Sequence, residues 1–306
     1  MTERSVGQPV GAEPLICTAG DLVEDIVVRA HATPVRDADV PATVTRHRGG
    51  SAANTAAVVA HLGGRARFVG QVGHDSTGAR LVDGLTALGV ECVVTRAGVT
   101  GTIVVTVEPG GARTMFSDRR AASGPPAFAA TALDGADVLH LPFYGLADSD
   151  LGGAGFRRLL ARARDSGILV SLDPSSIVLA GRSFLDVVRE SRPGVVFCNA
   201  AEAAALGVDD DGLPGAGLVV VKRGAEAVLL RGDAVATVAV PRIVRAVDTT
   251  GAGDAFAGGF LLALARGDDP VRAAGAGHAA AARVVGGVGA DAWTEEREAH
   301  DEDAAP

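Results

Sequence analysis

The sequence has few cysteines, few aromatic residues, a single lysine and no long apolar run. Its 306 residues include three cysteines, Cys17, Cys92 and Cys198. Their wide spacing argues against a zinc site or a disulfide framework, both of which need cysteines that cluster. Two of the three stand within apolar, strand-like runs, so we expect buried free thiols.

No apolar run approaches the roughly 20 residues that a membrane-spanning helix requires. The opening segment MTERSVGQPVGAEP, residues 1–14, also lacks the apolar core of a secretory signal peptide. We expect this segment to be a short disordered lead and the protein to be cytoplasmic, with no membrane partner.

Negative charge is concentrated near the end of the chain. The formal net charge is −9, and residues 294–306 hold six acids against one arginine, which gives this segment −5 and leaves −4 for the rest. We expect an acidic, disordered tail over 294–306, and the overall charge disfavours a nucleic-acid partner. The six acids are Glu295, Glu296, Glu298, Asp301, Glu302 and Asp303.

Short apolar runs alternate with segments of helical pattern through the middle of the chain. Helices are predicted over 76–89, 156–167 and 270–287, where apolar residues recur at helical spacing or a proline opens the run, and glycines close it. Continuous apolar strands that alternate with helices predict an α/β fold with a mostly parallel central sheet flanked by helices. The predicted strands are 15–20, 66–73, 137–142, 168–173, 194–199 and 217–222.

Two segments depart from this alternation. Residues 25–50 and 101–120 have the pattern of extended chain, and the turn EPGG makes a hairpin of the second. We expect them to form a small β-sheet lid, with segments of about 25–48 and 100–120.

The stretch VDTTGAGDAFAGGF, residues 247–260, places Asp254 where a helix is expected to start. A helix start exposes backbone N–H groups that attract anions, and small residues let a ligand approach them. Gly251, Ala252 and Gly253 would form such an anion hole, with Asp254 as a base that accepts a proton from a hydroxyl. The alternative is that Asp254 only caps the helix.

Five motifs in order resemble those of the ribokinase-like sugar and nucleoside kinases, the PfkB carbohydrate kinase family. The resemblance spans about residues 15 to 290 and implies a ribokinase-like kinase domain over 15–293 with a β-sheet lid. The motifs are GDLVED (20–25), GGSAANTA (49–56), GQVGHDSTG (70–78), NAAE (199–202) and DTTGAGDAFAGGF (248–260).

The resemblance implies ATP-dependent transfer of the γ-phosphoryl group to a hydroxyl of a small sugar, with Asp254 as general base. The sugar would be held by Gly49, Gly50 and Asn54, which form a close-approach turn with an amide donor. Asp25 would accept hydrogen bonds from vicinal hydroxyls. The alternative for Asp25 is a solvated carboxylate, since two other acids stand nearby.

The resemblance also implies metal ions. In the family the N-x-x-E residues organise magnesium and phosphate, which assigns Asn199 to the nucleotide and Glu202 to Mg²⁺, an ion that prefers hard oxygen ligands. Both residues also have the spacing of a helix capping box, and the two roles are compatible. Main-chain groups around Asp248, Val285 and Gly289 would hold a monovalent cation such as K⁺, as in some relatives.

The segment VVVKRGAEAVLL, residues 219–230, resembles the strand-turn-strand that lines the phosphates of the nucleotide. The resemblance assigns Lys222, Gly224 and Thr250 to nucleotide binding and His278 to contact with adenine. The chain departs from the family's T-x-G-x-x-G pattern, because Lys222 replaces the threonine. A strand-end charge is the favoured interpretation of Lys222, and a polar helix face explains His278 equally well.

The sequence leaves the identity of the sugar open. FSDRRAAS, residues 116–123, faintly resembles the R-x-x-SAAS region of 2-keto-3-deoxygluconate kinases. Arg119 or Arg120 would then pair with the carboxylate of a sugar acid, and we assign Arg120 to substrate binding. Two solvated arginines are the favoured alternative.

Three further alternatives concern function. A nucleoside substrate would need aromatic stacking, for which Phe116, Phe143 and Tyr144 are candidates. A catalytically silent sugar or nucleotide sensor would have no need of a base such as Asp254. A Rossmann dehydrogenase does not fit, because no G-x-G-x-x-G follows the first strand. Relatives often dimerise through their lids, so the resemblance also implies a homodimer.

Overall fold

The computed structural model describes residues 12–125, 127–147, 153–179, 181–240, 249–286 and 293. Within this part of the chain, nine strands form a large sheet in the order β13-β12-β11-β10-β9-β8-β1-β4-β5. The strands from β11 to β5 are parallel, and β12 and β13 are antiparallel additions at one edge. The strands are β1 (Leu15–Gly20), β4 (Arg65–Val72), β5 (Glu91–Arg96), β8 (Val138–Pro142), β9 (Leu169–Asp173), β10 (Val195–Asn199), β11 (Leu218–Lys222), β12 (Val228–Gly232) and β13 (Ala236–Val238).

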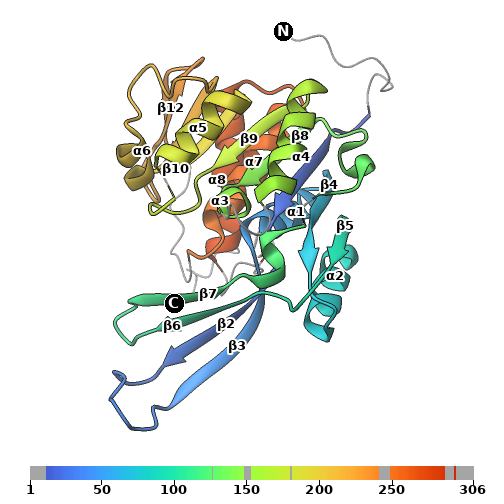
Figure 1. Cartoon of the computed structure of the whole chain (residues 1–306). Coiled ribbons are helices and arrows are strands. Elements are labelled where there is room, and N and C mark those ends of the chain that lie inside the picture. The colour runs from blue at the N-terminus through green and yellow to red at the C-terminus, as the bar shows by residue number, and fades with distance from the viewer. Residues whose placement is uncertain are drawn as a thin grey trace, which may run out of the picture.

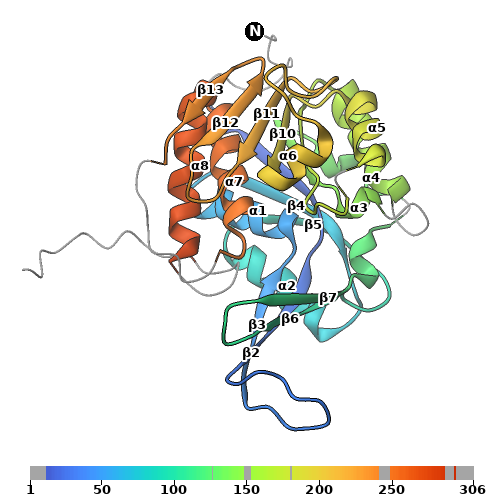
Figure 2. The same cartoon turned by 90° about the vertical axis from the view of Figure 1, so that its left-hand side faces the viewer.

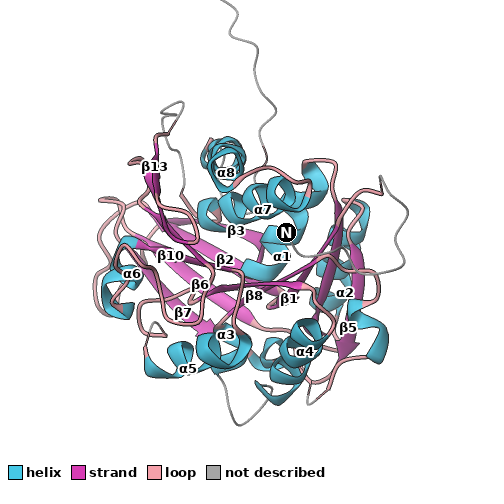
Figure 3. Cartoon of the chain, turned by 90° about the horizontal axis from the view of Figure 1, so that it is seen from above, coloured by secondary structure: helices cyan, strands magenta, loops and turns pink. Residues whose placement is uncertain are grey.

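Helices cover both faces of this sheet (Figure 3). Successive strand side chains point to opposite faces, so Ile16 lies in the core under α1, α2, α7 and α8, whereas Cys17 lies in the core under α4, α5 and α6. The predicted α/β fold with a mostly parallel, helix-covered sheet is confirmed. The helices are α1 (Ser51–His61), α2 (Ser76–Ala87), α3 (Tyr144–Ala147), α4 (Gly153–Asp165), α5 (Arg182–Ser191), α6 (Ala200–Leu206), α7 (Ala252–Ala265) and α8 (Pro270–Val285), with 3₁₀ turns at Arg120–Ser123 and Ala130–Leu133.

A separate four-stranded sheet, the lid, projects from one end of the molecule (Figures 1 and 2). Its order is β3-β2-β6-β7, and only the central pair, β2 and β6, is parallel. The predicted hairpin is present, with its EPGG turn closed by a hydrogen bond from Gly111 N–H to the Glu108 carbonyl. The lid strands are β2 (Val23–Ala30), β3 (Ala42–Gly49), β6 (Thr102–Val107) and β7 (Arg113–Asp118).

The lid joins the large sheet close to its carboxyl edge. The chain leaves β1 at Gly20 and enters β2 three residues later, then returns from β3 through Gly49 and Gly50 directly into α1. Gly50 has a φ of 102°, and a side chain there would overlap the Asp21 carbonyl, so this return needs glycine.

Several sequence-based expectations fall on residues that the structure does not describe. These are most of the lead, residues 1–11, all of the tail, 294–306, and two positions named for a cation, Asp248 and Gly289. Of the cysteines, Cys17 and Cys198 are buried as expected, and burial raises the pKa of each thiol to about 12, while Cys92 is half-buried. No described helix is long and apolar enough to span a membrane.

The two-sided core gives a stability prediction. Val220 is fully buried in β11, in register with Phe197 and Leu230, whereas Val178 is 87% exposed. Removing two buried methyl groups and leaving a cavity costs about 2 kcal/mol, so Val220→Ala should lower the free energy of unfolding by that amount. Val178→Ala, the same substitution at the surface, should change it by less than about 0.5 kcal/mol. Equal denaturant midpoints for the two variants would contradict this packing.

Candidate functional site

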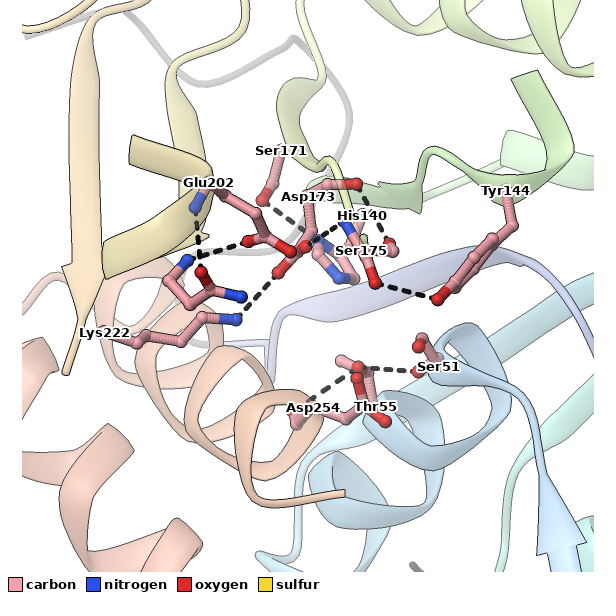
Figure 4. A network of polar contacts seen from close by, with 11 residues as sticks. Ser51, Thr55, His140, Tyr144, Ser171, Asp173, Ser175, Glu202, Lys222 and Asp254 are labelled. Atoms are coloured by element: carbon pink, nitrogen blue, oxygen red, sulfur yellow. Dashed lines mark hydrogen bonds and ion pairs between the residues drawn. The ribbon is translucent and has the colours of Figure 1, made fainter. Parts of the chain in front are cut away.

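A pocket of about 300 Å³ lies at the carboxyl ends of β9, β10 and β11, beside the amino end of α7. Parallel α/β sheets bind ligands at this edge, because the loops there converge from several strands. Figure 4 shows the polar side chains that meet in it. Its described lining includes Ser51, Asp173, Ser175, Asn199, Glu202, Lys222, Gly224, Ala252, Gly253, Asp254 and His278.

Asp254 stands in the first turn of α7 but does not cap it. The N-cap is Gly251, with a left-handed φ of 79°, and no side chain caps this helix start. The Asp254 carboxylate instead accepts a hydrogen bond at 3.0 Å from the amide of Asn54, 200 residues earlier in the chain. The alternative in which Asp254 serves only as a helix cap therefore does not describe this structure.

The surroundings of Asp254 shift the pKa of its carboxyl group upward. Burial raises the pKa of its carboxyl group to about 6, and the negative charge of Asp173 adds to the rise. The Asn54 amide, Lys222 and Ser51 oppose it by stabilising the charged form. A carboxylate with a pKa near neutrality can take up a proton during a reaction and release it afterwards.

Lys222 ends β11, as expected, but its ammonium group is directed into the pocket. Nζ lies 2.8 Å from Oδ2 of Asp173, and the two side chains are 17% and 14% exposed. Burial alone would lower the pKa of this lysine, but Asp173, Asp254 and Glu202 together raise it above its usual value. A Cβ added at Gly253 would lie 3.2 Å from Nζ, so the positive charge adjoins the start of α7.

Asn199 and Glu202 form the capping box that their spacing predicts. The Asn199 side chain accepts from Glu202 N–H at 2.9 Å, and the Glu202 carboxylate accepts from Asn199 N–H at 2.8 Å. Burial, and then the charge of Asp173, raise the pKa of Glu202 above its usual value. The box holds this carboxylate at the pocket wall.

The donor set fits Mg²⁺. Asp173, Glu202 and Asp254 bring three carboxylates against the ammonium of Lys222, and Arg223, which also lines the pocket, is paired with Glu226. This leaves an excess of two negative charges that a divalent cation would balance. Within the described residues no three such groups converge closely enough to hold a bare ion. This suits Mg²⁺, which keeps most of its waters and binds through one or two carboxylates and the phosphates of a substrate.

The lid supplies the other side of the site. Gly49 allows a close approach, because a side chain there would overlap the Asp25 carboxylate. At the far end of the lid, Arg113 donates a hydrogen bond at 2.9 Å to the hydroxyl of Thr250, next to the Gly251 turn. The lid therefore reaches both the turn at Gly49 and Gly50 and the loop that begins α7.

The two neighbouring arginines behave differently. Arg120 is exposed and pairs with Asp118, so its assignment to substrate stays a prediction. Arg119 forms an ion pair with the buried Asp21, and its guanidinium carbon lies 3.6 Å from the centroid of the Tyr144 ring. Arg119 is therefore not the solvated arginine of the alternative interpretation.

Sequence reasoning missed Asp173, Ser175 and Ser51. Asp173 carries the ion pair with Lys222, and one of its oxygens accepts from Ser175 N–H at 2.7 Å. The sequence could have identified Asp173, because it is the last residue of the predicted strand 168–173. The carboxyl ends of parallel strands meet at one edge of the sheet. Ser51 stands within the motif GGSAANTA but was not named as a site residue, and its hydrogen bond to the Asp254 side chain helps to hold the pKa of that carboxyl down.

Comparison with known proteins agrees with this architecture. The family model described as pfkB family carbohydrate kinase matches residues 14–297. An ATP-dependent ribose-1-phosphate kinase from Halopiger xanaduensis is 30% identical over 287 residues, covering 90% of this chain and 93% of that one. A fructokinase from Vibrio alginolyticus is 28% identical over 71% of this chain and 76% of its own length.

Solved structures give the same result. The adenosine kinase from Sinorhizobium meliloti superimposes with a TM-score of 0.79 and 26% identity, covering 91% of this chain and 96% of that one. The ribokinase from Thermotoga maritima gives 0.73 and 26%, covering 90% and 94%. Fold and comparisons together define an ATP-dependent kinase of sugars or nucleosides. The chain belongs to the pfkB family of carbohydrate kinases, as the motifs indicated.

The ion pair between Lys222 and Asp173 predicts that losing one partner destabilises the fold more than losing both. Lys222→Met leaves Asp173 buried without its partner, which for a buried pair costs about 3 kcal/mol. Adding Asp173→Asn removes the uncompensated charge, so the double variant should unfold at higher denaturant concentration than Lys222→Met alone. Urea unfolding at pH 8 tests this, and additive effects of the two substitutions would contradict the pairing.

Proposed function

We propose that this enzyme transfers the γ-phosphoryl group of ATP to a hydroxyl of a small sugar, with Asp254 as the general base. The observation that carries the proposal is the Asp254 carboxylate itself, buried at the uncapped start of α7 with a pKa raised to about 6. A carboxylate beside an anion-binding helix start has a use when it deprotonates the nucleophile that attacks the bound anion.

In the proposed reaction, Asp254 accepts the proton of the sugar hydroxyl while the hydroxyl oxygen attacks the γ-phosphorus. The bond from phosphorus to the bridging β-γ oxygen breaks, and ADP leaves with that electron pair. The backbone N–H group of Gly253 and the ammonium of Lys222 would stabilise charge on the transferred group, whereas the Ala252 N–H already donates to the Thr249 carbonyl at 3.3 Å. Mg²⁺, when bound near Glu202 and Asp173, would neutralise phosphate charge. Lid closure would exclude water.

The sugar is proposed to lie between Asp254 and the turn of Gly49, Gly50 and Asn54, with Asp25 on the lid strand above it. Gly224 and His278 line the same pocket on the nucleotide side. Thr250 adjoins it through the contact with Arg113. The potassium site stays a prediction, since two of its three positions lie outside the described residues.

A neutral sugar fits the described contacts better than the alternatives. A relative named 2-dehydro-3-deoxygluconokinase, from Thermoproteus tenax, is 29% identical over 79% of the chain. In this chain, however, Arg119 is already neutralised by Asp21, and its guanidinium covers one face of Tyr144, which leaves less of that ring for a nucleoside base. A panel of sugars, sugar phosphates, sugar acids and nucleosides scored by ADP formation decides the substrate.

A homodimer through the lid is also proposed. The lid presents three exposed large apolar side chains, Val44, Met115 and Phe116. Val44 and Phe116 share one face of the lid sheet, and Met115, next to Phe116 in β7, points to the other. Exposed apolar groups of this kind favour burial against a second copy.

Asp254→Asn tests the base. Asparagine keeps the size of the side chain and removes its basicity, so kcat should fall by about 10²- to 10⁴-fold while ATP still binds. The pKa of Asp254 in the folded protein lies above its unfolded value of 3.8, so ionisation of this carboxyl destabilises the fold as pH rises through about 6. At pH 8 the variant should therefore melt at the same or a higher temperature. Asp211→Asn, an exposed control, should change neither kcat nor the melting temperature. Full turnover by Asp254→Asn would contradict the proposal.

The pH dependence of kcat/KM gives a second test. The base must be ionised in the unliganded enzyme, so kcat/KM should fall as pH drops through about 6. The Asn54 amide helps to hold that pKa down, so Asn54→Ala should move the acidic limb to higher pH, whatever it does to sugar affinity. Superimposable limbs in the two enzymes would show that the titrating group is not Asp254.

A further inference from the structure

A second pocket, of about 490 Å³, lies at the root of the lid, away from the catalytic pocket. We call it the basic pocket. Its lining includes Arg46, His47, Arg48, His61, Arg80 and Trp293, and no acidic side chain is among the described lining residues. The proposed catalytic site makes no use of these residues.

The basic pocket carries net positive charge. Glu24, with a side chain 6% exposed, bonds to both Arg46 and Arg80. Three arginines and two histidines line the pocket, and no acidic side chain is among its described lining residues. Arg48 adds to the local field, and it contributes, after burial, to lowering the pKa of His61. Such a site favours a ligand with several negative charges.

Trp293, the last residue that the structure describes, lies at this pocket. Its indole ring stacks on His61, with centroids 4.7 Å apart and planes at 6°, and Arg283 lies 5.3 Å from the ring centroid. The ring packs against the small apolar cluster of Val58, Ala280 and Val284. The residue after Trp293 is therefore the first of a segment that starts at the pocket edge.

That segment has the complementary charge. Six carboxylates fall within residues 295–303. Ten extended residues reach about 33 Å, more than enough to cross a pocket whose wall includes Trp293 itself. A tethered segment acts at an effective concentration in the millimolar range, which a small anion in solution has to exceed.

We propose that the acidic segment 294–303 docks in the basic pocket and ties the end of the chain to the root of the lid. The register of the lid strands gives this contact a route to the sugar site. Arg48 lies opposite Glu24, and His47 opposite Asp25, and Gly49 and Gly50 follow at once. Helix α1 connects the two pockets, since Ser51 at its start lines the catalytic pocket and His61 at its end lines the basic one.

Trp293 is the only tryptophan in the sequence, so its fluorescence reports on the pocket directly. The test compares acrylamide quenching in the full chain with that in a full-length variant whose six tail acids are changed to Gln or Asn. Docking shields the indole, so we expect the quenching constant to rise about twofold in the variant. The wild type should show the same rise in 1 M NaCl, where the Debye length falls to about 3 Å.

Two arginine variants locate the contact. Arg46→Gln with Arg48→Gln should raise quenching as the tail variant does, while the matched change Arg29→Gln with Arg182→Gln, at exposed positions elsewhere, should not. Thermal melting of each variant checks that the fold is retained. Equal quenching constants in wild type, tail variant and pocket variant would overturn the proposal.

A synthetic peptide of residues 294–306 completes the test. It should bind the tail-neutralised chain and restore its shielding, and it should bind the wild type at least about tenfold more weakly because the tethered segment competes. Inorganic pyrophosphate serves as the small-anion probe. Equal affinity of peptide or pyrophosphate for the two chains would mean that the tail does not occupy the pocket, which would then be a site for anions from solution.

Discussion

The charge balance around Lys222 is the constraint on which the catalytic pocket depends. One ammonium group lies among three carboxylates, the buried Glu202 and the half-buried Asp173 and Asp254, at the edge where β9, β10 and β11 end. Without it, at least one carboxylate would take up a proton or the strand ends would move apart. With Lys222 present, the pocket keeps an excess of negative charge, which a divalent cation can balance when it binds together with a phosphate donor.

The sheet explains how residues so far apart meet. Parallel strands bring their carboxyl ends to one edge, so Asp173, Asn199 and Lys222 need only end their strands in order to converge. Asp254 arrives from a helix, and its partner Asn54 comes from the first turns of α1, directly after the lid. The hydrogen bond between these two thus couples Asp254 to the helix that directly follows the lid.

The sequence predicted the sheet, its helices and the lid hairpin because each rests on local periodicity and turn chemistry. It predicted Asp254, Glu202 and Asn54 because they stand in short motifs. It missed Asp173 as a site residue and favoured a solvated strand-end charge for Lys222. Both errors have one cause, since the pair forms across 49 positions of sequence and its burial depends on strand order. The inward turn of Arg119 toward Asp21 likewise depends on tertiary packing.

The two pockets stand at opposite ends of α1, and this arrangement links the charge of the chain end to the lid. The catalytic pocket has an excess of negative charge that a cation can balance. The basic pocket is lined by arginines and histidines, and the acidic segment follows one of its lining residues, Trp293, in the sequence. Had the acids been nearer the catalytic pocket, they would have repelled the phosphates of ATP. Anchoring Trp293 beside His61 starts that segment at the far end of α1, where its charge is complementary to its surroundings.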